Sequence, residues 1–249
     1  MSQQEINLLA RLLDESEKIV AFTGAGISTD SGIPDFRGPK GVWNTMKPIQ
    51  FHDFISSESV RRESWKRKFS GELSIYKARP NIGHAALARL YDRGKLQSII
   101  TQNVDGLHQL AGVPDSHVVE VHGNATFATC LSCERRYELG ALKEFFKEHG
   151  FVHDCNECGG IIKTATISFG QAMPEVEMRL AEQHSMECDF FLVLGSSLVV
   201  YPAAGLPQLA KTHGARLAII NEQNTDLDFL FDVRLEMNIG EVLAEVIAK

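Results

Sequence analysis

The sequence lacks several features that would place it in a specialised class of protein. No apolar run in its 249 residues approaches the ~18 residues of a membrane-spanning helix. The N-terminal stretch MSQQEINLLARLLDESEK is acidic and amphipathic, whereas a signal peptide starts with basic residues and continues into an apolar segment. Basic residues are in the minority, since 25 Lys and Arg stand against 32 Asp and Glu, for a net charge of −7. We therefore expect a cytoplasmic protein with no membrane partner and no direct nucleic-acid binding, which depends on Lys and Arg that neutralise phosphates.

Cysteine, glycine and proline are also too scarce for several specialised folds. Five cysteines do not make a secreted disulfide scaffold, and 20 glycines with 8 prolines exclude collagen-like and low-complexity chains. The apolar share of 44% and the charged share of 23% are ordinary for a globular protein, which excludes a largely disordered chain. A chain of this length forms one or two domains with a core that needs no disulfides.

Short apolar segments alternate with helical patterns along most of the chain. The expected strands are residues 18–23, 98–101, 117–121, 189–194 and 216–220, and the expected helices are residues 4–16, 81–92, 173–187, 202–212 and 241–248. Strands that are apolar throughout are buried on both faces, so this alternation predicts an open parallel α/β sheet. Residues 38–79 hold both tryptophans and show only weak periodicity, and we expect them to form a small helical insertion.

Polar or small residues follow five of the expected strands. These segments read GAG, QNVD, HGN, GSS and Asn-Glu, at residues 24–26, 102–105, 122–124, 195–197 and 221–222. Strand ends often carry turn residues, so one such segment alone indicates nothing. Because ligands bind at the carboxyl ends of the strands in open α/β sheets, the five together indicate a shared polar ligand site.

Four of the cysteines form two C-x2-C pairs, which are the firmest local signal in the sequence. Cys130 and Cys133 are followed, after a spacer of 21 residues, by Cys155 and Cys158. Tetrahedral zinc takes four such thiolates, and a closed four-thiolate shell predicts a structural zinc ion instead of a catalytic one. The alternative is four reduced cysteines without a metal. Cys188 stands alone and is expected to be a buried thiol.

Two other motifs have weaker support. Gly24 and Gly26 follow a strand, as in a dinucleotide-binding turn, but Thr29 stands where the third glycine of that fingerprint would be. A plain strand-to-helix turn explains this loop equally well. His122 follows an apolar strand, and a neutral imidazole suits general-base catalysis near pH 7. The alternative is a structural histidine at a strand end.

The order of the motifs is more specific than any one of them. GAGISTDSGIPDFRG, TQNVDGLH, HGN, the paired C-x2-C, GSSLVVYPAA and Asn221 follow one another along the chain. In this combination the sequence resembles the sirtuin family of NAD-dependent protein deacylases, of the bacterial or archaeal type. The resemblance implies a Rossmann-like open parallel sheet formed by residues 1–37, 80–124 and 165–249. It also implies a smaller domain made of the helical insertion at 38–79 and a zinc-ribbon insertion at 125–164.

The resemblance further implies a role for most residues of these motifs. His122 would be the general base, and Asn103 would be a second catalytic residue. Phe169, Gly170 and Gln171 would contact the substrate peptide. One zinc ion would be structural, and NAD would be the co-substrate. The residues expected to bind NAD are Gly24, Ala25, Gly26, Ser28, Asp35, Phe36, Arg37, Trp43, Gln102, Asn103, Val104, Asp105, Gly195, Ser196, Ser197, Asn221, Glu222, Gln223 and Ile239.

The activity implied is NAD-dependent deacetylation of an acyl-lysine protein or peptide, with nicotinamide and O-acetyl-ADP-ribose as products. Mono-ADP-ribosyl transfer and a non-catalytic NAD or ADP-ribose sensor are the alternatives. Gln171 departs from the family, where glutamate is usual, and removes a negative charge near the peptide channel. Trp65 and Lys68 stand at the spacing at which members that remove anionic acyl groups carry Tyr and Arg, so we expect acetyl-lysine to be preferred over succinyl-lysine.

Overall fold

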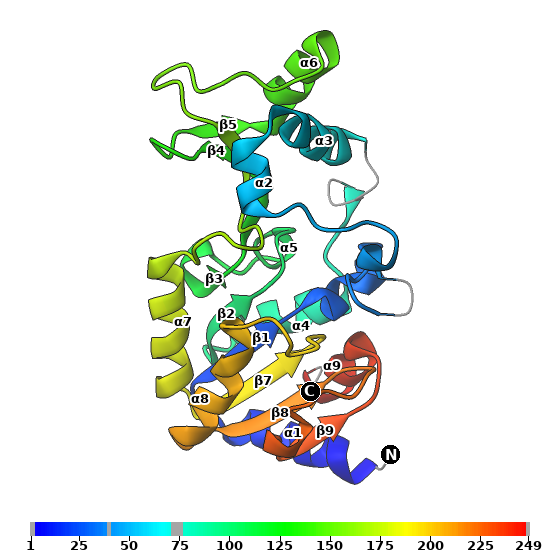
Figure 1. The fold of residues 1–249 in the computed structure, drawn as a ribbon. Helices are drawn as coiled ribbons and strands as arrows, with labels where there is room; N and C mark the ends of the chain where they lie inside the picture. The colour runs from blue at the N-terminus through cyan, green and yellow to red at the C-terminus, as the bar shows by residue number, and fades with distance from the viewer. Residues whose placement is uncertain (1–2, 39–40, 71–76, 248–249) are drawn as a thin grey trace.

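The larger part of the protein is a parallel six-stranded sheet with helices on both faces (Figure 1). The computed structural model describes residues 3–38, 41–70 and 77–247. The strands lie in the order β3-β2-β1-β7-β8-β9, and every neighbouring pair is parallel. This arrangement confirms the open parallel sheet expected from the alternating segments. The bounds are Ile19–Thr23 for β1, Leu96–Thr101 for β2, Val118–Glu120 for β3, Phe190–Leu194 for β7, Arg216–Ile220 for β8 and Val233–Leu235 for β9.

Alternate residues of the central strands face opposite layers of helices. On β1, Ile19 and Ala21 pack in one hydrophobic cluster, whereas Val20 and Phe22 pack in another. All residues of β1 are buried, which explains why the strand reads as a continuous apolar run. The helices of the first cluster are α1 (Gln3–Glu15), α4 (Ile82–Asp92) and α9 (Ile239–Ile247), and those of the second are α7 (Glu175–Glu187) and α8 (Leu206–Thr212). Within the described ranges, no helix has the length and apolar character needed to cross a membrane.

Some elements differ from the sequence-based expectation. The pattern does not predict β9, because this strand has three residues with the polar Arg234 in the middle. Strand β3 is shorter than expected, since His117 belongs to a 3-10 turn. Helix α8 begins at Leu206, after a 3-10 turn at Ala203–Gly205. The expectations for residues 1–2, 39–40, 71–76 and 248–249, at the chain ends and in the helical insertion, lie outside the described residues.

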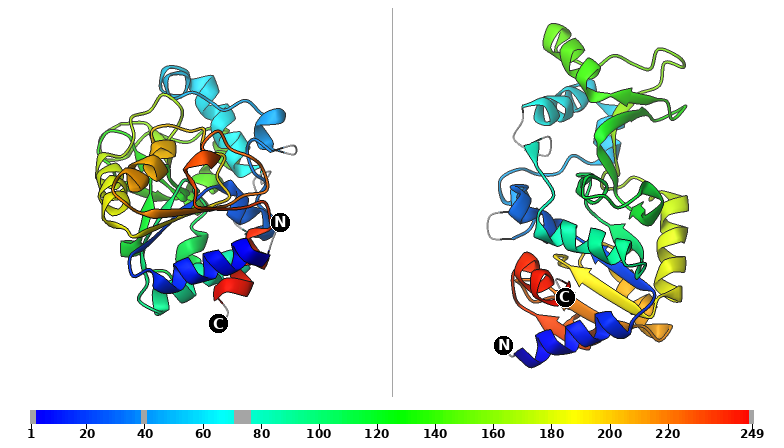
Figure 2. Two further views of the ribbon diagram at one scale, coloured as in Figure 1. Left: turned by 90° about the horizontal axis from the view of Figure 1, so that it is seen from below. Right: turned by 180° about the vertical axis from the view of Figure 1, so that it is seen from behind.

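A second, antiparallel sheet carries the paired cysteines and packs against the helical insertion. Trp65 lies in one hydrophobic cluster with Ala128, Leu142 and Ile162 of the cysteine-bearing segment, so the two insertions share a core. Figure 1 and the right-hand view of Figure 2 show them at one end of the molecule, away from the two chain termini. The strands lie in the order β5 (Arg136–Glu138), β4 (Gly123–Cys130) and β6 (Ile162–Thr166), and the helices near them are α2 (Phe51–Ser56), α3 (Glu58–Phe69) and α6 (Leu139–His149). The short helix α5 (Leu107–Leu110) contacts α4 instead.

Candidate active site

A cavity of about 660 Å³ lies between the carboxyl ends of the parallel strands and the helical insertion. All five polar strand-end segments contribute to its wall, and residues such as Met46 contribute from the helical insertion. Every residue that the sequence analysis assigns to NAD, to catalysis or to the peptide lies on this wall. The fold therefore gathers around one space the motifs that are dispersed along the sequence.

The glycines after β1 permit two strand ends to approach closely. Gly24 N donates to Leu194 O at 3.0 Å, and Gly26 N donates to Gly195 O at 2.9 Å. A Cβ atom on Gly24 would lie 2.6 Å from Gly195 O, and one on Gly26 would lie 2.6 Å from Gly195 Cα. Both obstacles are backbone atoms that cannot move aside, so chain packing already requires these glycines. The same packing leaves bare backbone on the cavity wall, which a pyrophosphate can approach.

Asn103, Asp105 and Ser28 form a buried hydrogen-bonded group at the cavity. Asn103 Nδ2 donates to Gly24 O at 3.0 Å and to Ser28 Oγ at 3.2 Å, and Ser28 Oγ donates to Asp105 Oδ2 at 2.8 Å. Asp105 Oδ1 also accepts from Leu107 N at 2.9 Å, so the carboxylate helps to start α5 as well as lining the cavity. All three side chains are buried, and polar groups interact strongly with a ligand in such a low-dielectric place.

His122 is held in one orientation by the neighbouring backbone. Its Nδ1 lies 3.1 Å from Gln102 O. A carbonyl oxygen only accepts, so the proton resides on Nδ1 and the lone pair on Nε2. Burial lowers the pKa of His122 from its ordinary 6.5, the hydrogen bond to Gln102 opposes this shift, and the charge of Arg37 lowers the pKa further. The ring is thus mostly neutral at pH 7, in the tautomer that can accept a proton.

Three aromatic rings connect different segments along one part of the wall. The ring centroids of Phe36 and Trp43 are 5.0 Å apart, and those of Trp43 and Phe169 are 5.2 Å apart. The Arg37 guanidinium lies 4.2 Å from the Trp43 centroid, within cation–π distance. Phe51 N donates to Phe169 O at 2.9 Å. The loop after β1, the helical insertion and the segment after β6 therefore meet here.

Gln171 closes a turn in the segment expected to contact a peptide. Ser168 N donates to Gln171 Oε1 at 3.1 Å, and Gln171 N donates to Ser168 O at 3.0 Å. A glutamate would offer the same acceptor together with a negative charge. Glutamine at this position therefore preserves the turn and makes the wall less negative.

Helix α3, where the sequence pattern gives little guidance, adds two cationic residues to the wall, which also includes Arg37 and Lys47. Arg67 and Lys68 both line the cavity. Lys68 Nζ donates to Ala125 O at 2.6 Å, and burial lowers the pKa of Lys68 to about 8. Trp65, considered in the sequence analysis as a neighbour of the acyl group, is instead buried in the shared core of the insertions, stacked on Phe69 with centroids 5.3 Å apart. Its indole is therefore unavailable to an acyl chain.

The paired cysteines form a cluster with the dimensions of a zinc site. The sulfur atoms of Cys130, Cys133, Cys155 and Cys158 all lie within 4.8 Å of one another, with 3.5 Å between those of Cys130 and Cys158. Four thiolates at ~2.3 Å from one zinc ion stand about 3.8 Å apart, so the cluster fits tetrahedral zinc. None of the four lines the cavity, which makes the zinc structural. Cys188 is buried elsewhere in the core, as expected.

Comparisons with known proteins agree with this geometry. A model of the Sir2 family matches residues 24–202. The chain is 48% identical over 238 residues to an NAD-dependent protein deacetylase of Rhodopseudomonas palustris, and the match covers 96% of this chain and 94% of that protein. The chain belongs to the Sir2 family. The NAD-dependent protein deacylase 2 of Archaeoglobus fulgidus, another Sir2 relative, is 38% identical over 98% of this chain and 96% of its own length.

Solved Sir2 structures have the same fold throughout. One, described as Sir2 with a p53 peptide and NAD+, matches with a TM-score of 0.87 and 35% identity over 100% of this chain and 98% of that chain. Another, described with a deacetylated p53 peptide and 3′-O-acetyl ADP-ribose, gives a TM-score of 0.89 and 35% identity over 98% and 97%. The sirtuin resemblance proposed from the motifs is thereby confirmed for nearly the whole chain.

Proposed function

We propose that this Sir2-family chain is an NAD-dependent protein lysine deacetylase and that the cavity is its active site. One observation carries the proposal. His122 has its Nδ1 on a backbone carbonyl and a lowered pKa, which leaves Nε2 able to accept a proton, and it shares a cavity with the bare backbone after β1 and with the segment around Phe169. The relatives named as deacetylases, and the Sir2 structures with NAD+, peptide and acetyl ADP-ribose, support the same activity.

The polar groups on the wall suit different parts of NAD. The bare backbone of residues 24–26 suits the pyrophosphate, and the buried group around Asn103 and Asp105 suits the nicotinamide and its ribose. Gln102 Nε2 donates to Ser196 Oγ at 2.7 Å, which links this end to the β7 loop. The wall residues that suit the adenosine half are Gly195, Ser196, Ser197, Asn221, Glu222, Gln223 and Ile239.

The chemistry divides between the co-substrate and the chain. NAD supplies the bond between nicotinamide and ribose that the reaction breaks, with lysine, nicotinamide and O-acetyl-ADP-ribose as products. Asn103 and Asp105 would hold the nicotinamide in an enclosed place. His122 would accept a proton at Nε2 from a ribose hydroxyl, and the segment Phe169 to Gln171 would orient the acyl-lysine.

We also propose that residues 1–37, 80–124 and 165–249 act as the NAD-binding domain and that 38–79 and 125–164 act as the small domain. The shared hydrophobic cluster of the two insertions supports this division. The zinc bound by the four cysteines would maintain the small domain and take no part in the reaction.

Product analysis tests the proposed function directly. The purified protein is mixed with an acetyl-lysine peptide and NAD, and the products are separated and weighed by liquid chromatography and mass spectrometry. We expect one nicotinamide and one O-acetyl-ADP-ribose for each deacetylated lysine. ADP-ribose attached to protein would instead show mono-ADP-ribosyl transfer, and NAD binding without turnover would show a sensor. Either result would overturn the proposal.

A further inference from the structure

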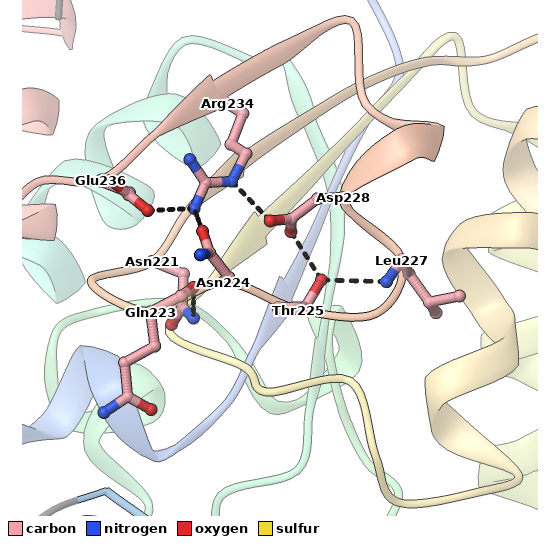
Figure 3. Close-up of polar contacts among 8 residues, drawn as sticks. All are labelled: Asn221, Gln223, Asn224, Thr225, Leu227, Asp228, Arg234 and Glu236. Atoms are coloured by element: carbon pink, nitrogen blue, oxygen red, sulfur yellow. Dashed lines mark hydrogen bonds and ion pairs between the residues drawn. The ribbon is translucent and has the colours of Figure 1, made fainter.

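The loop between β8 and β9 offers its first residues to the cavity. Asn221, Glu222 and Gln223 line the wall directly after β8. Asn221 N donates to Leu235 O at 3.0 Å, and Asn221 Nδ2 donates to Gln223 O at 2.7 Å (Figure 3). Glu222 and Gln223 themselves are exposed, so apolar packing does little to fix their positions. Their placement depends on what holds the rest of the loop.

The side chain of Arg234, on β9, joins this loop to the sheet. Its Nε donates to Asp228 Oδ2 at 2.6 Å, and its Nη2 donates both to the side-chain oxygen of Asn224 and to Glu236 (Figure 3). Thr225 Oγ1 donates to the other oxygen of Asp228 at 2.6 Å. One guanidinium thus binds the loop at two points, one of them next to the residues on the cavity wall.

The geometry suits arginine in particular. A planar guanidinium donates in several fixed directions at once, whereas an ammonium acts as a point charge. Isolated ion pairs at a protein surface contribute little, but Arg234 is only 28% exposed and bonds three side chains in one network. Arg234 is absent from the cavity wall, so it acts on that wall through Asn224.

We propose that Arg234 is a positioning residue that holds Asn221, Glu222 and Gln223 in place for the adenosine half of NAD. This inference rests on the proposed function, because that function assigns the adenosine half to this end of the cavity. Loosening the loop should weaken binding of the adenosine half and leave the reacting end around His122 unchanged.

The test variant is Arg234→Gln, which keeps a long polar side chain without the charge or the fork. At a saturating concentration of acetyl-lysine peptide, we expect the KM for NAD to rise about tenfold, the scale for losing a hydrogen bond to a charged group, with kcat within about twofold. Calorimetry with ADP-ribose alone should show that Arg234→Gln also binds ADP-ribose about tenfold more weakly. Arg234→Lys, which keeps the charge, should bind ADP-ribose more tightly than Arg234→Gln and less tightly than the wild type.

Arg216→Gln is the matched control, because Arg216 lies at the opposite end of β8 and pairs with Asp232 at 3.1 Å. It should leave the KM for NAD and the affinity for ADP-ribose unchanged. Asn224→Ala removes the acceptor from the exposed loop without altering β9, and it should reproduce the effect even if Arg234→Gln fails to fold.

An unchanged affinity for ADP-ribose in Asn224→Ala or in a folded Arg234→Gln would overturn the proposal. A lower kcat together with a lower thermal stability, and no selective rise in the KM for NAD, would also overturn it. Such a result would indicate a merely structural residue. If the wild-type protein binds ADP-ribose but does not deacetylate, the proposed function fails while the calorimetry still decides the role of Arg234. If the wild-type protein deacetylates but does not bind ADP-ribose, the proposal for Arg234 fails while the proposed function stands.

Discussion

Replacing His122 with alanine should reduce the rate of deacetylation about 10²–10⁴-fold, the usual effect of losing a general base. This range corresponds to about 3–5 kcal/mol of transition-state stabilisation. A group with a pKa below 6.5 is more than about 75% neutral at pH 7. Since burial lowers the pKa of His122 below that value, most of the wild-type protein is ready to accept a proton, and the full loss should be observed. NAD affinity should stay within a few-fold, because the residues proposed to hold the pyrophosphate and the adenosine lie elsewhere on the wall.

The same ring determines how activity depends on pH. Only the neutral form of His122 accepts a proton, so activity should be highest well above the lowered pKa and should fall as pH decreases through it. The midpoint of the acid limb of kcat/KM should therefore lie below 6.5. If the His122 ring were exposed to solvent, the midpoint would lie near the ordinary histidine pKa of 6.5.

The assay is initial-rate deacetylation of an acetyl-lysine peptide between pH 5 and 8, with NAD affinity measured separately by calorimetry. His117→Ala is a suitable control, because His117 stands at the other end of β3 and is absent from the cavity wall. It should retain wild-type rates. A His122→Ala protein with a kcat within about tenfold of the wild type would refute the base assignment. An acid-limb midpoint above 6.5 would refute the account of its protonation.

Three further predictions concern the metal, the acyl group and acid stability. Cys155→Ser should bind less than one zinc per chain and lose stability in the small domain first, whereas Cys188→Ser should keep its zinc, as metal analysis and thermal melts will show. Acetyl-lysine should exceed succinyl-lysine in kcat/KM by more than about tenfold, because burying a poorly paired carboxylate is costly. Equal values would show that a cationic wall residue, such as Arg67 or Lys68, pairs with the carboxylate. Burial lowers the pKa of His84 to about 4 in the folded protein. Between pH 6.5 and 4 the unfolded chain therefore binds a proton at His84 that the folded protein does not bind. Its share of the unfolding free energy, up to about 3 kcal/mol, should disappear between pH 6.5 and 4, and urea unfolding of His84→Gln should show a smaller loss than the wild type.

The sheet and the cavity were predictable for a physical reason. Central parallel strands are buried on both faces, so segments such as Phe190–Leu194 appear as continuous apolar runs. Parallel strands also end at one edge, so the polar residues after them meet there. Asn103 and Ser28 are distant in sequence, yet they are in hydrogen-bond contact because β1 and β2 are neighbours.

The insertion and the sheet edge were less predictable. Strand β9 has three residues, which is too few to show a periodic pattern, and its central Arg234 looks like a solvent-exposed charge in the sequence. Helix α3 reads ESVRRESWKRKF, with charges on most sides. Trp65 decides which side of α3 faces the cavity, because it packs into a core formed with the cysteine-bearing segment, which lies far along the chain. No local pattern contains that information.

The topology predicts that a zinc ion outside the cavity affects catalysis. Strand β4 starts directly after His122 and ends at Cys130 of the cysteine cluster. Strand β6 returns from the cysteine cluster, pairs with β4, and leads to Ile167, whose N–H donates to His122 O at 2.8 Å. His122 and the segment after Ile167 are thus both continuous with the two strands that a zinc ion at the cysteine cluster would hold together. Loss of the metal should therefore reduce turnover by displacing His122, although the metal contacts neither substrate.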